Sequence, residues 1–207
     1  KNGEILTPQD DSPIKQLLTE QDPDIICFQE TRCSEINGKK IIISGYNSIF
    51  NESKLDGARN CNRYSGTAIY IKDSIKYSHI ETAISEYEDL EGRIIVLHME
   101  NLIIINVYAP NSGTNYDSKI KFMQSFLNFL DNIDKNIDVI FCGDMNIAID
   151  THFNKERFKP GPGFYKHELD FHYKLDYIGY KDTIDKNKGK IIYTWWDPRQ
   201  RVMINLG

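Results

Sequence analysis

The sequence lacks long hydrophobic runs and an excess of positive charge. No apolar run approaches the roughly 18 residues that a membrane-spanning helix needs, and the opening KNGEILTPQDD has neither the basic end nor the apolar stretch of a signal peptide. We therefore expect an intracellular protein that is neither secreted nor bound in a membrane. With a formal net charge of -5, any binding of DNA would need a local basic strip rather than bulk charge.

Cysteine is also sparse, and its spacing does not suggest a metal site. Cys27, Cys33, Cys61 and Cys142 show no zinc-type pairing. Cys27 and Cys142 lie inside apolar, strand-like runs, where a cysteine usually serves as a small hydrophobic residue. We expect all four to be reduced thiols, as is usual inside cells.

The composition is that of a folded globular protein. Hydrophobic residues make up 40% of the 207 residues and charged residues 27%, which is too apolar for a disordered chain. A chain of this length can form one domain with a substantial core. No repeat, low-complexity tract or linker divides it, so we expect a single domain over residues 1–207.

Short runs rich in β-branched residues predict strands along the chain. They are DIICF (24–28), KKIIIS (39–44), GTAIYIK (66–72), RIIVLHM (93–99), LIIINVY (102–108) and DVIFCGD (138–144). Only Glu100 and Asn101 separate the fourth run from the fifth, which predicts a tight antiparallel hairpin. Helical patterning is confined to residues 12–20, 118–133 and 165–175. This mixture favours an α+β layered sandwich over a doubly wound parallel sheet.

Two of the predicted strands end in acidic groups that a core would not need. DIICF leads directly into Gln29, Glu30 and Thr31, and a carboxylate there suits Mg²⁺, which prefers one or two carboxylates with water and phosphate. DVIFCGD ends in Asp144, and if the extended backbone continues, Asp144 and Asn146 leave the same face. Such an acid and amide could form a hydrolytic pair. A solvated loop acid and an ordinary turn remain the structural alternatives.

A third strand end, in NVYAPNSG, carries Tyr108 and, after Pro110, Asn111. Both side chains can donate to a phosphoryl group, while the proline fixes the turn that presents them. A turn without function is again the alternative. The conjunction of the three ends is informative because convergent strand ends can build a rigid active site.

These blocks resemble motifs of a known family. DIICFQETRC, NVYAPNSG and CGDMNIA resemble, in order, the PDI-x-C-x-QET, Y-x-PN-x-G and GD-x-N blocks of the exonuclease III / AP endonuclease family, within the endonuclease/exonuclease/phosphatase superfamily. RYSGTAIY, EGRIIV and IIYTWWDPRQRVMINLG resemble segments of its AP-endonuclease branch. The resemblance implies a four-layer α/β-sandwich with two mostly antiparallel central sheets flanked by helices.

The resemblance also assigns roles residue by residue. It implies that Glu30, Asp144 and Asn146 form the metal site, with Glu30 as the main ligand. Asp144 would orient or deprotonate the attacking water, Asn146 would hold that water, and Tyr108 would be the catalytic tyrosine beside the scissile phosphate. The implied DNA-contacting residues are Asn111, Tyr64, Ser65, Gly66 and Trp195. Trp195 would lie against the extruded abasic sugar, although a core role for this tryptophan stays open.

The implied function is Mg²⁺-dependent cleavage of the DNA backbone 5′ to abasic sites in base excision repair, with 3′-exonuclease or 3′-phosphodiesterase activity as an accompaniment. Mn²⁺ is expected to substitute for Mg²⁺. The expected partner is double-stranded DNA with abasic sites, where extruding a nucleotide costs least. We expect a monomer, nuclear in a eukaryote and cytoplasmic in a prokaryote or for a virus.

The sequence departs from the family pattern at both ends. It shows neither the opening W-N-x-N/D-G strand nor the terminal Ser-Asp-His block, and none of its histidines (His79, His98, His152, His167 and His172) lies in the context of that block. We therefore expect a single domain that lacks the family's first strand and C-terminal strands. Two alternatives stay open: a retroelement-type or general endonuclease, against which EGRIIV and TWWDPRQ argue, and a catalytically dead remnant.

Overall fold

The computed structural model of the chain describes residues 13–54, 64–80, 84, 89–113, 116–148 and 160–183. The chain divides into two compact units. Unit 1 comprises Lys1–Ala109 and Ile133–Met145, and unit 2 comprises Pro110–Asn132 and Asn146–Gly207. All the described strands belong to unit 1, whereas the two longest described helices belong to unit 2.

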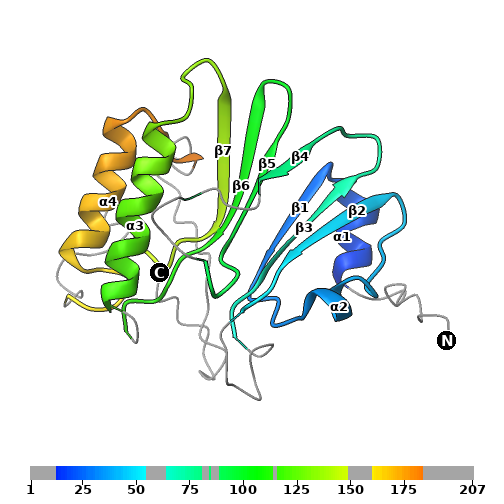
Figure 1. The fold of residues 1–207 in the computed structure, drawn as a ribbon, viewed down its shortest axis with the longest axis horizontal. Coiled ribbons are helices and arrows are strands. Elements are labelled where there is room, and N and C mark those ends of the chain that lie inside the picture. The colour runs from blue at the N-terminus through cyan, green and yellow to red at the C-terminus, as the bar shows by residue number, and fades with distance from the viewer. Residues whose placement is uncertain are drawn as a thin grey trace. The chain divides into compact units, whose positions relative to one another are not determined.

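Unit 1 contains two sheets (Figure 1). The three-stranded sheet has the order β1-β3-β2 and is antiparallel, with strands β1 (Ile25–Gln29), β2 (Tyr46–Asn51) and β3 (Thr67–Lys72). The four-stranded sheet has the order β4-β5-β6-β7, with strands β4 (Ser78–Ile80), β5 (Ile94–His98), β6 (Leu102–Tyr108) and β7 (Asp138–Asp144). The predicted β5–β6 hairpin is confirmed, and among the described strands only β6 and β7 pair in parallel. The predicted α+β class with mostly antiparallel sheets is therefore confirmed.

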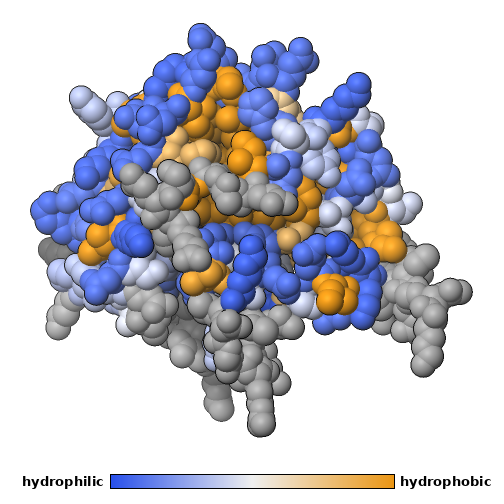
Figure 2. Space-filling view, in the orientation of Figure 1, coloured by the Kyte–Doolittle hydropathy of each residue, from blue (hydrophilic) through white to orange (hydrophobic). Residues whose placement is uncertain are grey.

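Alternation along β3 divides the core of unit 1 into two layers. Ile69 and Ile71 belong to the cluster between the sheets, together with Ile95, Leu97 and Ile104, all at most 6% exposed. Tyr70, between them in sequence, faces the other side and packs with Leu18 of helix α1 (Pro13–Gln21), as the two-residue period of a strand requires. Apolar residues are visible in the opening between the two sheets, bordered by hydrophilic ones (Figure 2). The sheets thus pack through a largely aliphatic layer.

The predicted strand at residues 39–44 is wrong. The short helix α2 (Glu35–Gly38) begins after Ser34, whose side chain caps it, and leads into a turn and a loop. In that loop Ile43 is buried, and the carbonyl of Ile41 accepts a hydrogen bond from the Tyr70 hydroxyl at 3.0 Å. The apolar run therefore covers the outer face of the three-stranded sheet without pairing. The strand follows at β2, whose mixed sequence YNSIFN gave no clear alternation.

Unit 2 is built on helices α3 (Tyr116–Asp131) and α4 (Lys166–Tyr177). Both were predicted, as was α1. The buried face of α3 includes Phe122, Phe126 and Leu130, and Phe126 stacks on Phe171 of α4 with ring centroids 6.5 Å apart. Each fully buried Phe side chain contributes about 2–3 kcal/mol relative to an exposed one. Among the described residues of either unit, no helix is long and apolar enough to span a membrane.

Candidate metal and phosphate site

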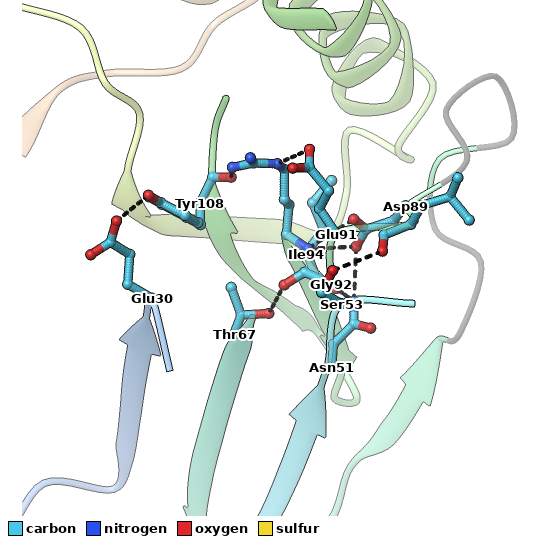
Figure 3. A network of polar contacts seen from close by, with 11 residues as sticks. Glu30, Asn51, Ser53, Thr67, Asp89, Glu91, Gly92, Ile94 and Tyr108 are labelled. Atoms are coloured by element: carbon cyan, nitrogen blue, oxygen red, sulfur yellow. Dashed lines mark hydrogen bonds and ion pairs between the residues drawn. The ribbon is translucent and has the colours of Figure 1, made fainter. Parts of the chain in front are cut away.

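Glu30 and Tyr108 meet at the ends of two strands from different sheets of unit 1. Glu30 directly follows β1 and has a left-handed backbone with φ 51°. Tyr108 is the last residue of β6, and its hydroxyl donates a hydrogen bond to Oε1 of Glu30 (Figure 3). The other carboxylate oxygen of Glu30 faces Arg32 Nη2 at 3.3 Å, in a pair that is about half exposed and so contributes little to stability. Glu30 thus offers an open carboxylate that a cation could reach.

Asp144 is the second candidate carboxylate. It ends β7 opposite Tyr108 in the parallel pairing, and its carbonyl accepts the N–H of Ala109 at 2.8 Å. Burial raises the pKa of Tyr108, the hydrogen bond to Glu30 and the negative charges of Glu30 and Asp144 raise it further, and the Arg93 charge opposes them. Both carboxylates therefore act on one hydroxyl. That hydroxyl remains protonated at neutral pH and serves as a hydrogen-bond donor.

The donor set fits Mg²⁺ better than a soft or borderline metal. Two carboxylates can supply hard oxygen ligands, and Mg²⁺ usually completes its shell with water and substrate phosphate. Within the part of the chain that the structure describes, no group of three His, Cys, Asp or Glu side chains could hold a metal.

Gly143 brings Asp144 into this position. It pairs with Val107 of β6 and has φ 133°. A Cβ atom at Gly143 would lie 1.9 Å from the carbonyl oxygen of Val107, far inside van der Waals contact. The close approach of β7 to β6 therefore depends on the absence of a side chain at this residue.

Arg93 contacts both the backbone and the ring of Tyr108, and it was not among the predicted site residues. It is 5% exposed, and its Nη1 donates to the Tyr108 carbonyl at 3.0 Å while the guanidinium lies 4.9 Å from the centre of the Tyr108 ring. Its Nε donates to Glu91 at 2.9 Å. The carboxylate of Asp89 accepts the backbone N–H groups of Arg93 and Ile94 (Figure 3). In the sequence, the one indication of its role was an arginine directly before a run of apolar residues.

Arg93→Lys should lower the free energy of unfolding by about 2–3 kcal/mol, because a lysine cannot replace both directed hydrogen bonds and leaves buried acceptors unpaired. Urea denaturation would measure this. The matched control is Arg32→Lys, in the exposed pair with Glu30, which should change stability by less than about 0.5 kcal/mol. Equal losses in the two variants would contradict a supporting role for Arg93.

The predicted DNA-contacting loop lies beside the turn that carries Glu30. The N–H groups of Thr31 and Arg32 donate to the carbonyls of Gly66 and Ser65 at 3.1 and 3.0 Å. Arg32 and Ser65 are both left-handed, with φ 49° and 56°. Tyr64 is 65% exposed, whereas Ser65 and Gly66 are buried. A side-chain contact of this loop with DNA would therefore come from Tyr64.

Asn111 and Asn146 lie together in unit 2. Asn111 Nδ2 donates to Asn146 Oδ1 at 3.4 Å, and Asn111 Oδ1 accepts the Gly113 N–H at 2.7 Å. The fully buried Lys119 donates to the Asn146 carbonyl at 3.4 Å. The extended backbone that would put Asp144 and Asn146 on the same face does not continue, because β7 ends at Asp144 and Asn146 has φ 51°.

The remaining predictions concern Trp195 and the cysteines. Trp195 and Cys61 lie outside the described residues. Of the two cysteines expected as small core residues, Cys27 packs partly buried against the core between the sheets, whereas Cys142 is exposed on β7. The expectation that Cys142 is a core residue is therefore wrong, although its side chain still contacts that of Cys27.

Relatives of known name match most of the chain. The exodeoxyribonuclease of Bacillus subtilis is 29% identical over 190 residues, which cover 88% of this chain and 72% of that protein. The DNA-(apurinic or apyrimidinic site) endonuclease of Dictyostelium discoideum is 30% identical over 192 residues, 87% of this chain and 51% of that protein. Recombination repair protein 1 of Drosophila melanogaster is 32% identical over 195 residues. The chain spans only 27% of the length of that last relative.

Solved structures share the fold. An AP endonuclease from Archaeoglobus fulgidus has a TM-score of 0.70 at 24% identity, covering 90% of this chain and 72% of the other. A 3′-5′ exonuclease from Neisseria meningitidis has a TM-score of 0.73 at 20% identity, covering 90% and 73%. At these identities the likeness concerns the fold alone.

The family match extends over nearly all of the sequence. The model described as the endonuclease/exonuclease/phosphatase family covers residues 4–200. The named relatives include exodeoxyribonucleases and an AP endonuclease, as the three motif blocks and the EGRIIV segment indicate. The resemblance to the exonuclease III / AP endonuclease group is thus confirmed, and the chain belongs to the endonuclease/exonuclease/phosphatase family.

Proposed function

We propose that this protein is a Mg²⁺-dependent DNA phosphodiesterase that cuts the backbone 5′ to abasic sites in base excision repair. The observation that carries the proposal is the meeting of Glu30 and Tyr108, with the charge of Asp144 acting on the same hydroxyl. The relative named as an apurinic or apyrimidinic site endonuclease supports the choice of lesion. We further propose that the protein acts as a monomer and that both units belong to one family domain.

Glu30 and Asp144 are the proposed metal ligands. When bound there, Mg²⁺ would neutralise phosphate charge and help the leaving oxygen depart. The Tyr108 hydroxyl keeps its proton because its pKa is raised, so it can donate a hydrogen bond to a phosphate oxygen. Asp144 would accept a proton from the attacking water, which is a role suited to a carboxylate at the end of a rigid strand.

The remaining roles rest on the family resemblance. Asn146 would hold the attacking water and complete the metal site, and Asn111 would donate to the phosphate. Tyr64 would contact the DNA backbone, and Trp195 would lie against the extruded abasic sugar. Binding through phosphates and a distorted lesion needs no large positive charge on the whole protein, which agrees with its net charge of -5.

A 3′-exonuclease or 3′-phosphodiesterase activity is the second candidate. Its support is the name of the Bacillus subtilis relative, an exodeoxyribonuclease of which the chain spans 72%. The chemistry is the same hydrolysis of a phosphodiester, applied at a strand end instead of at an internal lesion. Both activities could therefore use the same side chains.

The test uses two 5′-labelled duplexes that differ only in one abasic analogue. We expect a single cut 5′ to the lesion in Mg²⁺ or Mn²⁺, no cut in EDTA, and no cut in the intact duplex. A ladder that shortens from the 3′ end would support the exonuclease candidate. Equal internal cutting of both duplexes would favour a general endonuclease, and absence of any cleavage by the folded protein would favour a dead remnant.

A further inference from the structure

A hydrogen-bonded pair of amides, of which Asn106 is fully buried and Gln29 partly buried, joins the two sheets of unit 1 next to the candidate site. Gln29, the last residue of β1, donates from Nε2 to Oδ1 of Asn106 on β6 at 2.7 Å. Asn106 is fully buried, and its Nδ2 donates to the carbonyls of Phe28 and Ala68, each at 3.0 Å. Every polar group of the Asn106 side chain is thus used in holding β6 to the three-stranded sheet.

This polar pair interrupts an otherwise aliphatic layer. Along the inward face of β6, Ile104 belongs to the core between the sheets, Asn106 follows two residues later, and Tyr108 two residues after that. Along β1, Cys27 packs against the same core and Gln29 follows at the same two-residue spacing. The sandwich therefore changes from an aliphatic layer to an amide layer and then to the contact of Tyr108 with Glu30.

A hydrogen-bonded amide pair fixes the relative position of two strands more closely than an aliphatic pair does. Apolar packing is non-directional, so it tolerates small sliding of one sheet over the other, whereas a hydrogen bond restricts distance and angle. Two packed sheets exchange no ladder hydrogen bonds, so side-chain contacts between them contribute to their relative register. Replacing a buried hydrogen-bonded pair by apolar groups can be nearly neutral for stability, so stability alone does not account for amides here.

We propose that Gln29 and Asn106 are positioning residues, which fix β1 against β6 and thereby hold the Glu30 carboxylate at the Tyr108 hydroxyl. Gln29 is adjacent to Glu30, and Asn106 is two residues from Tyr108. Few bonds therefore separate the amides from the groups they position. The consequence for catalysis rests on the proposed function, because a displacement of about 1 Å at a reacting group can cost about a hundredfold in rate.

The first test measures the contact itself and needs no activity. Tyrosine labelled with ¹³C at Cζ reports its hydroxyl environment by NMR, Tyr108→Phe assigns the resonance, and Glu30→Gln marks its position with the carboxylate removed. We expect Gln29→Met and the double variant Gln29→Met/Asn106→Leu to move the Tyr108 resonance towards the Glu30→Gln position. If the resonance stays at its wild-type position in both variants, the positioning role is wrong.

The matched control is Tyr70→Phe, which removes another partly buried hydrogen bond of unit 1, the one to the Ile41 carbonyl. It destabilises the same three-stranded sheet without touching the amide layer. We expect it to leave the Tyr108 resonance in place. If Tyr70→Phe moves the resonance as far as the amide variants do, general loosening explains the effect and the positioning role is overturned.

The second test measures Mn²⁺ binding by calorimetry without DNA, followed by nicking of the abasic duplex. We expect the amide variants to bind Mn²⁺ at least about tenfold more weakly than the wild type, with a matching loss in kcat and an unchanged KM for DNA. Tyr70→Phe should bind as the wild type does. If the wild type neither binds Mn²⁺ nor nicks DNA, the proposed function fails, while the NMR comparison still decides whether the amides hold the contact.

Discussion

Asp144→Asn should slow single-turnover nicking of an abasic duplex by about a thousandfold. The amide keeps the size of the carboxylate, and the backbone contacts of β7 do not depend on the charge, so the fold should be unchanged. An amide cannot accept a proton from water and binds Mg²⁺ weakly. The rate at saturating DNA, measured over a range of Mg²⁺ concentrations, separates the two roles. A loss that excess Mg²⁺ does not restore indicates the proton acceptor, whereas recovery indicates a metal ligand only.

Asp138→Asn is the matched control for this variant. Asp138 is the first residue of the same strand and is exposed, at the end of β7 remote from Asp144. It should nick DNA at the wild-type rate. If Asp144→Asn retains a rate within about tenfold of the wild type, Asp144 is not the proton acceptor.

Gly143→Ala should lower the free energy of unfolding by at least about 3 kcal/mol. The new Cβ would overlap the Val107 carbonyl oxygen, 1.9 Å away. Because that oxygen belongs to the backbone of the neighbouring strand, no side-chain rotation can relieve the overlap, and the ends of β6 and β7 must separate. Urea denaturation measures the loss, and nicking should fall with it, since Tyr108 and Asp144 end these two strands.

Gly45→Ala separates steric overlap from backbone strain. Gly45 also has a positive φ, 84°, yet nothing lies within 4 Å of the position of its Cβ. In this variant the free energy of unfolding should fall only by the cost of placing an alanine in the left-handed conformation, about 1–2 kcal/mol. Comparable losses at the two glycines would show that the close approach of β7 to β6 is not the determining feature.

Local hydrophobic patterns in the sequence were enough to predict most of the strands and helices and the polar residues at the strand ends. β1, β3, β5, β6 and β7 and the three longer helices follow from hydrophobic period, and Glu30, Tyr108 and Asp144 were identified because each polar residue ends an apolar run. The predicted strand at residues 39–44 was wrong because burial of Ile43 against the sheet leaves the same apolar signal as strand pairing. Contacts between residues far apart in the sequence leave no such local pattern, so they could not be predicted.

The supporting residues were missed for that physical reason. Arg93 precedes an apolar strand as many surface arginines do, and its burial arises only when Tyr108 stacks beside it. Gln29 and Asn106 are separated by 77 residues, so neither shows its partner in the sequence. The condition of an extended backbone up to Asn146 was not met, because an asparagine tolerates the left-handed backbone that ends the extended run.

The left-handed residues around Glu30 create a conflict between the geometry that the proposed catalysis needs and thermal stability. Glu30, Arg32 and Ser65 all adopt positive φ without being glycine, at a cost of about 1 kcal/mol or more each. Glycine at Arg32 or Ser65 would relieve that strain, but it would also free the backbone that aims the neighbouring carboxylate. Selection for a higher melting temperature would therefore favour changes in this loop that selection for repair would reject.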